Sequence, residues 1–446
     1  MSVSRRTFLG TSAAAVLAAG TLASKNVFGA NDRIRVGCVG LHGRGRSHIA
    51  AFSDLAGSEV TALCDVDRKV LEEQAGRLRR RTGKQPKTYV DMRDLLADGS
   101  VDAVSFATPN HWHTLGAIWA CQAGKDVYVE KPLSHNLWEG RQLVEAAARY
   151  GRVVQHGAQR RSDPEWIRAI QRMREGVIGK VYMARALCFK ARGSIGHKPD
   201  GPAPDGLDWD LWQGPAPARP FNPNYVHYNW HWFWAYGNGD LGNQGVHQMD
   251  VAVWGLDKGF PVRVSSSGGR FGYEDQGETP NTQICTYTYG DGTLLVFEVR
   301  GLPTNDEGGA RVGNLFYGSE GYMIEREFFD TKGRPIRDVG RAAAPRAGRR
   351  GTRAAPSPPP TVRGTGNHYE TFLRAVRSRK PEDIAGSALD GHLSSGHCHL
   401  GNIAFRVGRD LTFDPTTERF VGEFSGEANV LLSREYREGF EVPRLI

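Results

Sequence analysis

The sequence predicts an α/β protein of two domains, in which a parallel sheet comes first and an open, mainly antiparallel sheet follows. A chain of 446 residues is longer than a single hydrophobic core usually supports. Its hydrophobic content of 39% is enough to form two cores. In the first third of the chain, short apolar runs alternate with amphipathic segments, as in parallel sheets covered by helices on both faces. Beyond residue 180, strand-like runs are joined by short Gly/Asp turns, which are typical of antiparallel hairpins.

The first domain is expected at residues 31–155. Apolar strand runs occupy residues 34–40, 59–65, 101–108, 126–132 and 153–159. Between them, the spacing of apolar residues predicts helices over 70–81 and 114–123. This alternation of strands and helices predicts a doubly wound parallel sheet.

The second domain is expected at residues 156–425, and its first helix should begin at Pro164 and end near Gly176. Strand runs follow at 180–189, 262–271, 282–301 and 314–327, and the later helices are expected within 367–379 and 393–409. An Arg- and Pro-rich stretch at 337–363 lacks the residues to form a core and is expected to be a mobile surface insertion. A C-terminal tail at 426–446 ends the chain.

Residues 1–30 have the layout of a cleavable leader. Arg5 and Arg6 are followed by Thr7, Phe8 and Leu9 and then by a small-residue apolar stretch over 13–23. This stretch is too short and too rich in Ala and Gly for a membrane span, so no stable span is expected after processing. The local order matches a twin-arginine signal, which predicts an exported or periplasmic protein that uses the twin-arginine export machinery. A general secretory leader or a lipid-retained tail is the alternative.

The charge distribution argues against nucleic acid as a partner. The net charge is +8, but seven arginines stand against one acid within 337–363, and Arg5, Arg6 and Lys25 lie in the leader. The rest of the chain is close to neutral, so the sequence predicts no basic footprint on a folded face.

The cysteines and histidines show no metal-binding pattern. Six cysteines are dispersed through mostly apolar runs without a C-x-x-C spacing, which predicts buried thiols. The pairs His227/His231 and His397/His399 lack closely spaced carboxylate partners. We therefore predict structural or hydrogen-bonding histidines and no metal.

A glycine-rich turn follows the first strand run. Its sequence is Gly40-Leu41-His42-Gly43-Arg44-Gly45. The position matches the G-x-G-x-x-G turn of Rossmann domains, where the backbone and a helix N-terminus approach the pyrophosphate of a dinucleotide. His42 stands at the middle glycine position, which is a departure from that turn.

Asp65 ends the second strand run, where an acidic side chain accepts hydrogen bonds from the adenosine ribose. A carboxylate there repels a 2′-phosphate, so the sequence favours NAD over NADP. Arg44 and Arg68 could neutralise such a phosphate and leave NADP open. A purely structural capping role for Asp65 is the alternative.

Three further motifs carry a family resemblance. They are Phe-Ala-Thr-Pro-Asn-His-Trp-His at 106–113, Glu-Lys-Pro at 130–132, and the segment 237–250 with its Gly-x-His-x-x-Asp. With these motifs the chain resembles the glucose-fructose oxidoreductase and inositol dehydrogenase family, written Gfo/Idh/MocA, from about Ile34 to Arg409. The resemblance implies an N-terminal Rossmann domain, and an α/β domain whose open sheet often mediates homo-oligomers, here a dimer or tetramer.

The resemblance also implies roles for individual residues. Lys131 would point at the junction of nicotinamide and substrate, and His247 would face the reacting hydroxyl as acid/base. Arg161, in an R-x-x-P stretch, would lie near the substrate. The residues that would line the nicotinamide half of the cofactor groove are Thr108, Pro109, Asn110, His113 and, at its edge, Glu130.

Chemistry supports the pairing of Lys131 with His247. Oxidising a sugar hydroxyl requires a base for the proton and a cation beside the developing alkoxide. Family members commonly carry Asp at the position of Asn243, and an amide there can orient a hydroxyl but cannot accept a proton. Asp250, one turn after His247, is expected to be a structural partner.

Aromatic residues crowd the stretch 225–236, with Trp230 and Trp232 as candidates for contact with the sugar. A packed aromatic core is an equally good interpretation of this stretch.

Three functions remain open from the sequence. The first is an NAD(P)-dependent oxidoreductase for a sugar, sugar derivative or cyclitol, with a tightly bound cofactor that is regenerated in place. The second is a redox-neutral glycoside hydrolase or lyase that acts through a keto-sugar. The third is a non-catalytic exported sugar-binding protein, which His42 and Asn243 favour.

Overall fold

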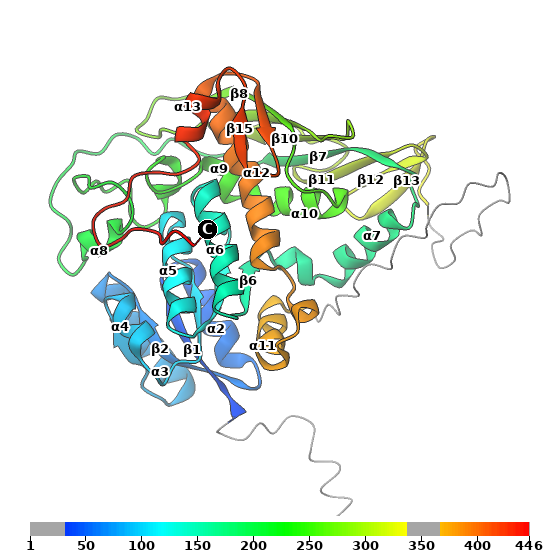
Figure 1. Cartoon of the computed structure of the whole chain (residues 1–446). Coiled ribbons are helices and arrows are strands. Elements are labelled where there is room, and N and C mark those ends of the chain that lie inside the picture. The colour runs from blue at the N-terminus through cyan, green and yellow to red at the C-terminus, as the bar shows by residue number, and fades with distance from the viewer. Residues whose placement is uncertain (1–31, 337–365, 446) are drawn as a thin grey trace, which may run out of the picture.

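The computed structural model describes residues 32–336 and 366–445, and it consists of two sheets with their helices (Figure 1). The expected leader at 1–30 and the stretch 337–363 lie outside the described residues. The N-terminal sheet and the C-terminal sheet lie at opposite ends of the molecule, with most helices between and beside them.

The first sheet is wholly parallel, in the order β3-β2-β1-β4-β5-β6. Its strands are β1 (Ile34–Val39), β2 (Ser58–Cys64), β3 (Lys87–Tyr89), β4 (Ala103–Phe106), β5 (Asp126–Glu130) and β6 (Val154–Gly157). The strand order changes direction between β1 and β4. In a doubly wound sheet this switch point, at the carboxyl ends of the strands, is where a ligand binds.

Helices join the strands of this sheet. They are α2 (Arg44–Asp54), α3 (Arg68–Thr82), α4 (Met92–Ala97), α5 (Asn110–Gln122) and α6 (Leu137–Arg149). The side chain of Asp67 caps the first backbone N–H groups of α3, and Gly83 ends the helix in a left-handed conformation. These signals fix where α3 starts, and therefore the short turn that carries Asp65.

Both faces of the first sheet are covered, and one cover comes from the far end of the chain. Leu95, Leu115 and Leu143 from α4, α5 and α6 pack on one face. On the other face, α2 and α3 are joined by α11 (His368–Ser378), whose Phe372 and Leu373 are buried against the sheet. The tail after residue 430 also returns to this domain.

The second sheet has nine strands in the order β13-β12-β11-β7-β10-β9-β8-β14-β15. Its strands are β7 (Val181–Phe189), β8 (Arg263–Gly269), β9 (Thr282–Thr288), β10 (Leu294–Arg300), β11 (Val312–Gly318), β12 (Gly321–Ile324), β13 (Glu327–Asp330), β14 (Leu411–Asp414) and β15 (Arg419–Val421). All its neighbours pair antiparallel except β7 and β10. The sheet is therefore mixed but mainly antiparallel, as expected.

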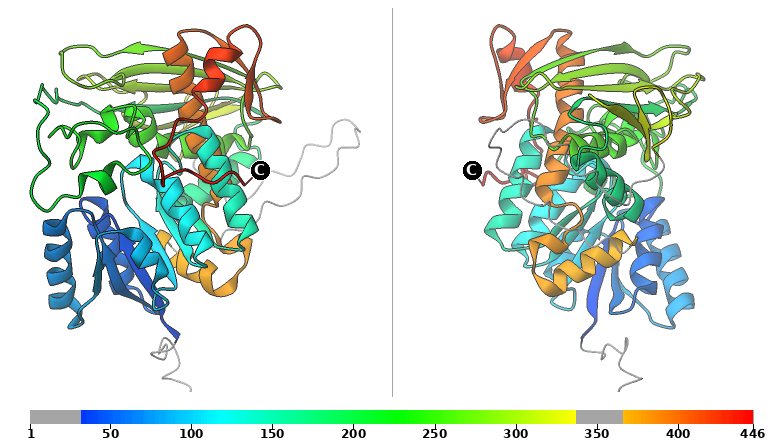
Figure 2. Two further views of the ribbon diagram at one scale, coloured as in Figure 1. Left: turned by 60° about the vertical axis from the view of Figure 1, so that its left-hand side comes forward. Right: turned by 90° about the vertical axis from the view of Figure 1, so that its right-hand side faces the viewer.

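Helices cover the face of this sheet that looks toward the first domain. They are α7 (Pro164–Arg174), α9 (Gly239–Asn243), α10 (Val246–Leu256) and the long α12 (Ala388–Val407), with the short α8 (Trp209–Gln213) and α13 (Ser425–Val430) at the periphery. Figure 2 shows α12 running from the second sheet down to the helices of the first domain, and it packs against α6. The two domains therefore share a continuous helical layer.

The strand runs expected from the sequence are strands in the structure, but the short strands β3, β14 and β15 and most of β13 were not expected. The edge strand β3 was not expected because Lys87, Thr88 and Tyr89 carry no apolar run. The expected hairpin joins β9 to β10.

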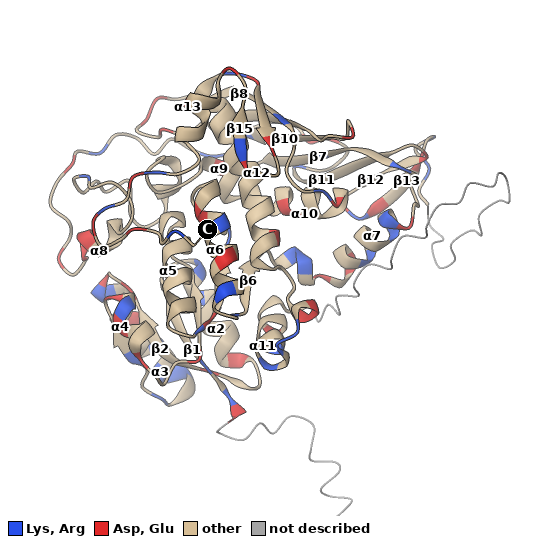
Figure 3. Cartoon of the chain, viewed as in Figure 1, with Lys and Arg blue, Asp and Glu red and all other residues tan. Residues whose placement is uncertain are grey.

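The cysteines and the charges also follow the expected pattern. All six cysteines are buried with free thiols. Figure 3 shows both acidic and basic positions on helix α7, which carries Glu165 together with Arg168, Arg172 and Arg174. Within residues 32–336 and 366–445, no helix has the length and apolarity to cross a bilayer, and no cluster of three His, Cys, Asp or Glu side chains could hold a metal ion.

Candidate active site

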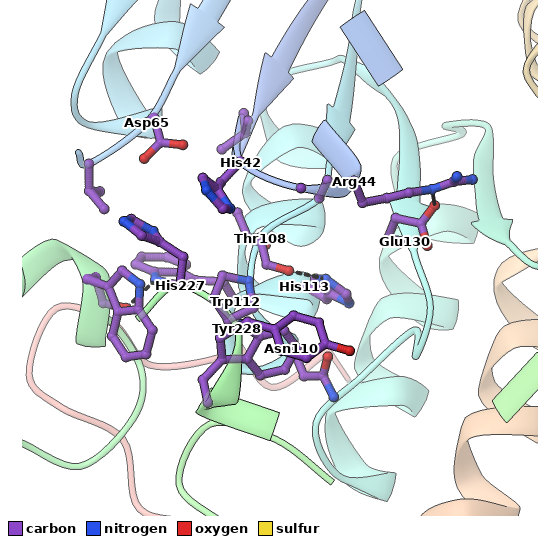
Figure 4. A pocket seen from close by; sticks show the side chains of 18 of the residues that line it. His42, Arg44, Asp65, Thr108, Asn110, Trp112, His113, Glu130, His227 and Tyr228 are labelled. Carbon is purple, nitrogen blue, oxygen red and sulfur yellow. Dashed lines mark hydrogen bonds and ion pairs between the residues drawn. The ribbon is translucent and has the colours of Figure 1, made fainter. Parts of the chain in front are cut away.

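A cavity of about 440 Å³ opens at the switch point, between the carboxyl ends of β1 and β4 and the second domain (Figure 4). Fourteen of the residues expected at the site line it: Gly40, His42, Gly43, Arg44, Asp65, Thr108, Pro109, Asn110, His113, Glu130, Lys131, Trp230, Asn243 and His247. Gly45, Arg161 and Trp232 are not among the lining residues.

The glycine turn is shaped for close backbone approach. A Cβ on Gly40 would lie 2.8 Å from the backbone of Ala107 and Thr108, and one on Gly45 would lie 1.9 Å from the carbonyl oxygen of Gly40. Gly45 thus lets α2 start directly against β1. At Gly43, which caps α2 with φ +48°, a Cβ would meet nothing within 4 Å, so the backbone there faces open space. A pyrophosphate fits this cradle.

His42 does not close the cradle. Its imidazole is stacked on that of His227 from the second domain, with ring centroids 4.7 Å apart. The departure from glycine therefore puts a side chain across the groove and not into the turn.

Two orphaned polar atoms mark the nicotinamide end. Thr108 Oγ1 and Asn110 Oδ1 are buried at the cavity wall and have no hydrogen-bond partner among the described residues. Figure 4 shows both side chains on the same stretch of wall. Buried polar atoms are normally satisfied, so this pair fits a ligand with polar groups such as a nicotinamide nucleotide.

Asp65 is held in place by the backbone of the turn. Its Oδ2 accepts from the Leu41 N–H at 2.7 Å, and its Oδ1 accepts from the Asp67 N–H at 3.0 Å. Burial raises the pKa of Asp65 to about 6, and the two N–H donors oppose this shift. The carboxylate is fixed at the end of the groove opposite Asn110, where the adenosine ribose of a dinucleotide would lie (Figure 4).

Glu130 is a buried carboxylate surrounded by donors. Arg44 Nε, His48 Nε2 and Gln159 Nε2 lie 2.8, 3.2 and 3.0 Å from its Oε1. Burial alone would raise the pKa of Glu130, but the His48 contact and the positive charges of Arg44 and Lys131 hold it well below its usual range. Glu130 therefore remains an anion that anchors the wall of the cavity.

Lys131 and Asn243 are joined across the two domains. Lys131 Nζ donates to the main-chain oxygen of Asn243 at 2.8 Å and to its Oδ1 at 3.1 Å. Burial lowers the pKa of Lys131, while the negative charges of Glu130 and Asp240 oppose the shift. Asn243, at the end of α9, thus aims the ammonium group into the cavity without neutralising it.

His247 stands in the first turn of α10 and lines the same cavity. Its ring makes no hydrogen bond to any described residue. Burial, and next the charge of Lys131, lower the pKa of His247 to about 3. The imidazole is therefore neutral at pH 7, and it faces the cavity beside the ammonium group of Lys131.

The aromatic stretch divides between two roles. Trp230 lines the cavity, whereas Trp232 is 2% exposed and belongs to a cluster with Trp212, Phe233 and Tyr236. Trp232 thus belongs to a packed aromatic core, whereas contact of Trp230 with a sugar stays a prediction.

Arg161 makes a buried ion-pair network. Its Nε lies 2.9 Å from Asp250 Oδ2, and its Nη1 lies 2.8 Å from Asp390 Oδ1. Asp250 is 1% exposed and is, as expected, a structural partner. Arg161 joins β6 to α10 and α12 behind the cavity, so its contacts are those of a structural residue.

Several further residues line the cavity that were not named individually as site candidates. Trp112, Gln159, Leu207, Trp212, His227 and Tyr228 also border the cavity. Trp112 and Gln159 lie within or next to stretches singled out in the sequence. Leu207 and His227 belong to a long excursion of the second domain, and no local signal indicates that it reaches the glycine turn.

Solved structures share this architecture. The WlbA dehydrogenase from Bordetella pertussis, in complex with NADH and UDP-GlcNAcA, superposes with a TM-score of 0.61 at 20% identity, over 86% of this chain and 99% of that chain. The scyllo-inositol dehydrogenase from Lactobacillus casei, with bound NAD(H) and scyllo-inositol, gives a TM-score of 0.59 at 17% identity, over 85% and 99%. At such identities the likeness establishes the fold.

Curated relatives match over a shorter stretch. A glycosyl hydrolase family 109 protein from Shewanella sp. (strain W3-18-1) is 31% identical over 159 residues. The matched stretch is 35% of this chain and 35% of the relative.

Two family models together cover most of the chain. The model described as an oxidoreductase family with an NAD-binding Rossmann fold matches residues 34–158. The model of the C-terminal alpha/beta domain of the same oxidoreductase family matches residues 187–316 and 356–442. The chain therefore belongs to the Gfo/Idh/MocA oxidoreductase family, and its N-terminal domain is an NAD-binding Rossmann fold.

Proposed function

We propose that the protein is an NAD-dependent oxidoreductase that acts on a hydroxyl group of a sugar, sugar derivative or cyclitol and keeps its cofactor tightly bound. The observation that carries this proposal is the convergence of Lys131, Asn243 and His247 on the cavity that the dinucleotide residues line. The two dehydrogenases named above, which bind a nucleotide sugar and an inositol, support the substrate class.

The residues divide the work as follows. Bound NAD supplies a hydride acceptor at the nicotinamide end of the groove, where Thr108 and Asn110 offer polar atoms. His247, neutral at pH 7, accepts the proton of the substrate hydroxyl. Lys131, aimed by Asn243, stabilises the negative charge that develops on the same oxygen.

The preference for NAD over NADP rests on carboxylates. Asp65 and Asp67 both lie at the adenosine end, and a 2′-phosphate would add negative charge beside them. Mass analysis of the nucleotide that acid releases from the purified protein tests this preference, with NAD as the expected product.

Addition of sugars or cyclitols to the protein with its bound NAD tests the activity. The near-ultraviolet absorbance of the reduced nicotinamide should appear with the right substrate and disappear on addition of a carbonyl acceptor. A protein that holds NAD but reduces it with no member of a broad carbohydrate panel contradicts the oxidoreductase proposal.

A redox-neutral glycoside hydrolase is the second candidate, and the glycosyl hydrolase family 109 relatives favour it. In that reaction a ring hydroxyl is first oxidised to a ketone, which acidifies the neighbouring C–H. Loss of that proton then breaks the glycosidic bond and expels the aglycone by elimination. Water adds to the resulting double bond, and the hydride returns to the ketone. Lys131 and His247 would serve both reactions. Release of nitrophenol from a nitrophenyl glycoside without any added acceptor distinguishes the hydrolase from the oxidoreductase.

We also propose that the protein is exported by the twin-arginine route and works as a homo-oligomer. Substitution of both Arg5 and Arg6 by Lys should leave the full-length protein in the cytoplasm, as cell fractionation would record. Light scattering of the processed protein should give the mass of a dimer or tetramer.

A further inference from the structure

A segment of the second domain lies directly against the adenosine end of the groove. This closing segment, residues 206–230, meets the turn between β2 and α3 through its backbone. Leu207 and Asp67 form an isolated antiparallel bridge. The Arg68 N–H donates to the Gly206 oxygen at 2.9 Å, and the Asp208 N–H donates to the Val66 oxygen at 2.9 Å.

A second contact of the closing segment reaches the glycine turn. His227 stacks on His42 with an interplanar angle of 19°, and its Nε2 lies 3.2 Å from Asp67 Oδ2. We call His42, Asp67 and His227 the clasp. It joins the turn before α2, the cap of α3 and the closing segment (Figure 4 shows His42, His227 and Asp65 on facing walls).

The closing segment is also held from behind. Trp112 Nε1 donates to the carbonyl oxygens of Leu211 and Trp212, each at 3.1 Å. His111 Nε2 lies 2.9 Å from the Trp212 oxygen, and Arg437 of the C-terminal tail donates to the Asp210 oxygen at 2.9 Å. The segment is thus held as a wall of the cavity beside Asp65.

We infer that the closing segment and its clasp retain the dinucleotide through successive turnovers, so that its exchange is slow compared with catalysis. This inference rests on the proposed function. An adenosine moiety on Asp65 would lie between the glycine turn and residues Leu207 and His227, which line the cavity with it. For the dinucleotide to leave the groove, the stacked rings of His42 and His227 would have to separate.

Retention restricts the class of reaction. The substrate carbinol loses a hydride and a proton and becomes a carbonyl. If NADH cannot leave, the same hydride and a proton must reduce a second carbonyl compound to an alcohol, or must return to the first substrate after its rearrangement. In the first route the second carbonyl compound is the oxidant and leaves as an alcohol with the two electrons. In the second route the hydride returns to the first substrate, so no oxidant is needed.

An isotope exchange experiment tests the clasp. The full-length protein with its bound NAD is mixed with an excess of NAD carrying a radiolabel in the adenine, and protein-bound label is followed after gel filtration. His227→Ala and His42→Gly should each accelerate exchange by about tenfold or more, the factor that corresponds to about 1.4 kcal/mol. The double variant should gain little beyond His227→Ala, because that change already removes the His42–His227 stack and the His227–Asp67 contact.

His197→Ala is the matched control, since His197 is exposed on the same domain and does not line the cavity. It should exchange at the wild-type rate. Unchanged exchange in both clasp variants overturns the inference and leaves the proposed function standing. Wild-type exchange within the mixing time overturns the inference and also the tight binding of the cofactor, while the oxidoreductase activity stands. A folded protein that contains no dinucleotide and takes up none overturns the proposed function and the inference together.

His42→Gly places in the turn the glycine that such turns usually carry, and it leaves the sequence of the closing segment unchanged. It therefore tests the clasp even if His227→Ala disturbs the folding of that segment. Thermal melting of each variant checks that the fold is intact.

Discussion

The ammonium group of Lys131 donates to both the main-chain and the side-chain oxygen of Asn243, at 2.8 and 3.1 Å. These residues are far apart in the sequence and come from different domains. The pair fixes the direction of an ammonium group that lines the same cavity as His247. An amide at this position holds Lys131 by hydrogen bonds alone, without the countercharge that a carboxylate would bring.

Lys131→Met should lower kcat by at least about 100-fold, because it removes the cation beside the developing alkoxide. The NAD content after purification should not change. Lys190→Met is the control, since Lys190 is an exposed lysine that does not line the cavity. Wild-type turnover by Lys131→Met would show that the cation takes no part in the chemistry.

His247→Asn should reduce kcat by about 100-fold or more while bound NAD is retained. Because burial lowers the pKa of His247 to about 3, the wild-type kcat/KM should stay level between about pH 8 and pH 5. An acid limb in that range that disappears in His247→Asn would contradict this pKa. The pH–rate profiles of the two proteins measure both effects.

Arg161→Ala should destabilise the protein by about 3 kcal/mol or more, because it leaves Asp250 buried without its partner. The double variant Arg161→Met with Asp250→Leu should recover much of that loss. Urea unfolding of the three proteins measures the free energies. If Arg161 instead binds substrate, Arg161→Lys will raise KM with little change in stability.

Acid should destabilise the fold through buried neutral histidines. Burial lowers the pKa of His111, His156 and His399 to about 3 each, below the value of an unfolded chain. The unfolded state therefore binds more protons below about pH 6.5, and each such histidine costs about 1.4 kcal/mol per pH unit of further acidification. Stability should be complete above about pH 6.5 and lost as the pH falls toward these native values.

Thermal melting at pH 7 and pH 5 checks this acid effect, with a lower Tm expected at pH 5. Asp65, whose pKa is raised to about 6, opposes the trend as a single group. An equal or higher Tm at pH 5 would contradict the prediction.

The local parts of the site could be predicted from sequence. Gly40 and Asp65 each follow a strand whose apolar run is unmistakable, and a parallel sheet brings strand ends to one edge. Lys131 and His247 came from a family resemblance, and the structure places both on one cavity. The separation of Trp230 from Trp232 was not predictable, because it depends on which side of a short 3₁₀ turn each ring faces.

Long-range contacts account for what the sequence did not indicate. His227 meets His42 only because the backbone of residues 206–208 pairs with the β2–α3 turn, and no periodicity encodes that pairing. Arg161 matched a motif near the cleft, yet its charge is satisfied by Asp250 and Asp390 behind the wall. The R-x-x-P motif thus predicted that Arg161 lies near the cleft, but not that its guanidinium group points away from the cavity.

Helix α11 has a consequence for the order in which the molecule can form. Its Phe372 and Leu373 complete a core whose residues in the first sheet and its helices are synthesised about 220 to 340 positions earlier. A nascent chain that ends just after β6 therefore lacks α11. One face of its first sheet is then incompletely covered, and Phe52 and Tyr128 lose their contacts with that helix. The dinucleotide half cannot be excised at the end of that strand as a portable module, and any chimera that transplants it must bring residues 366–380 along.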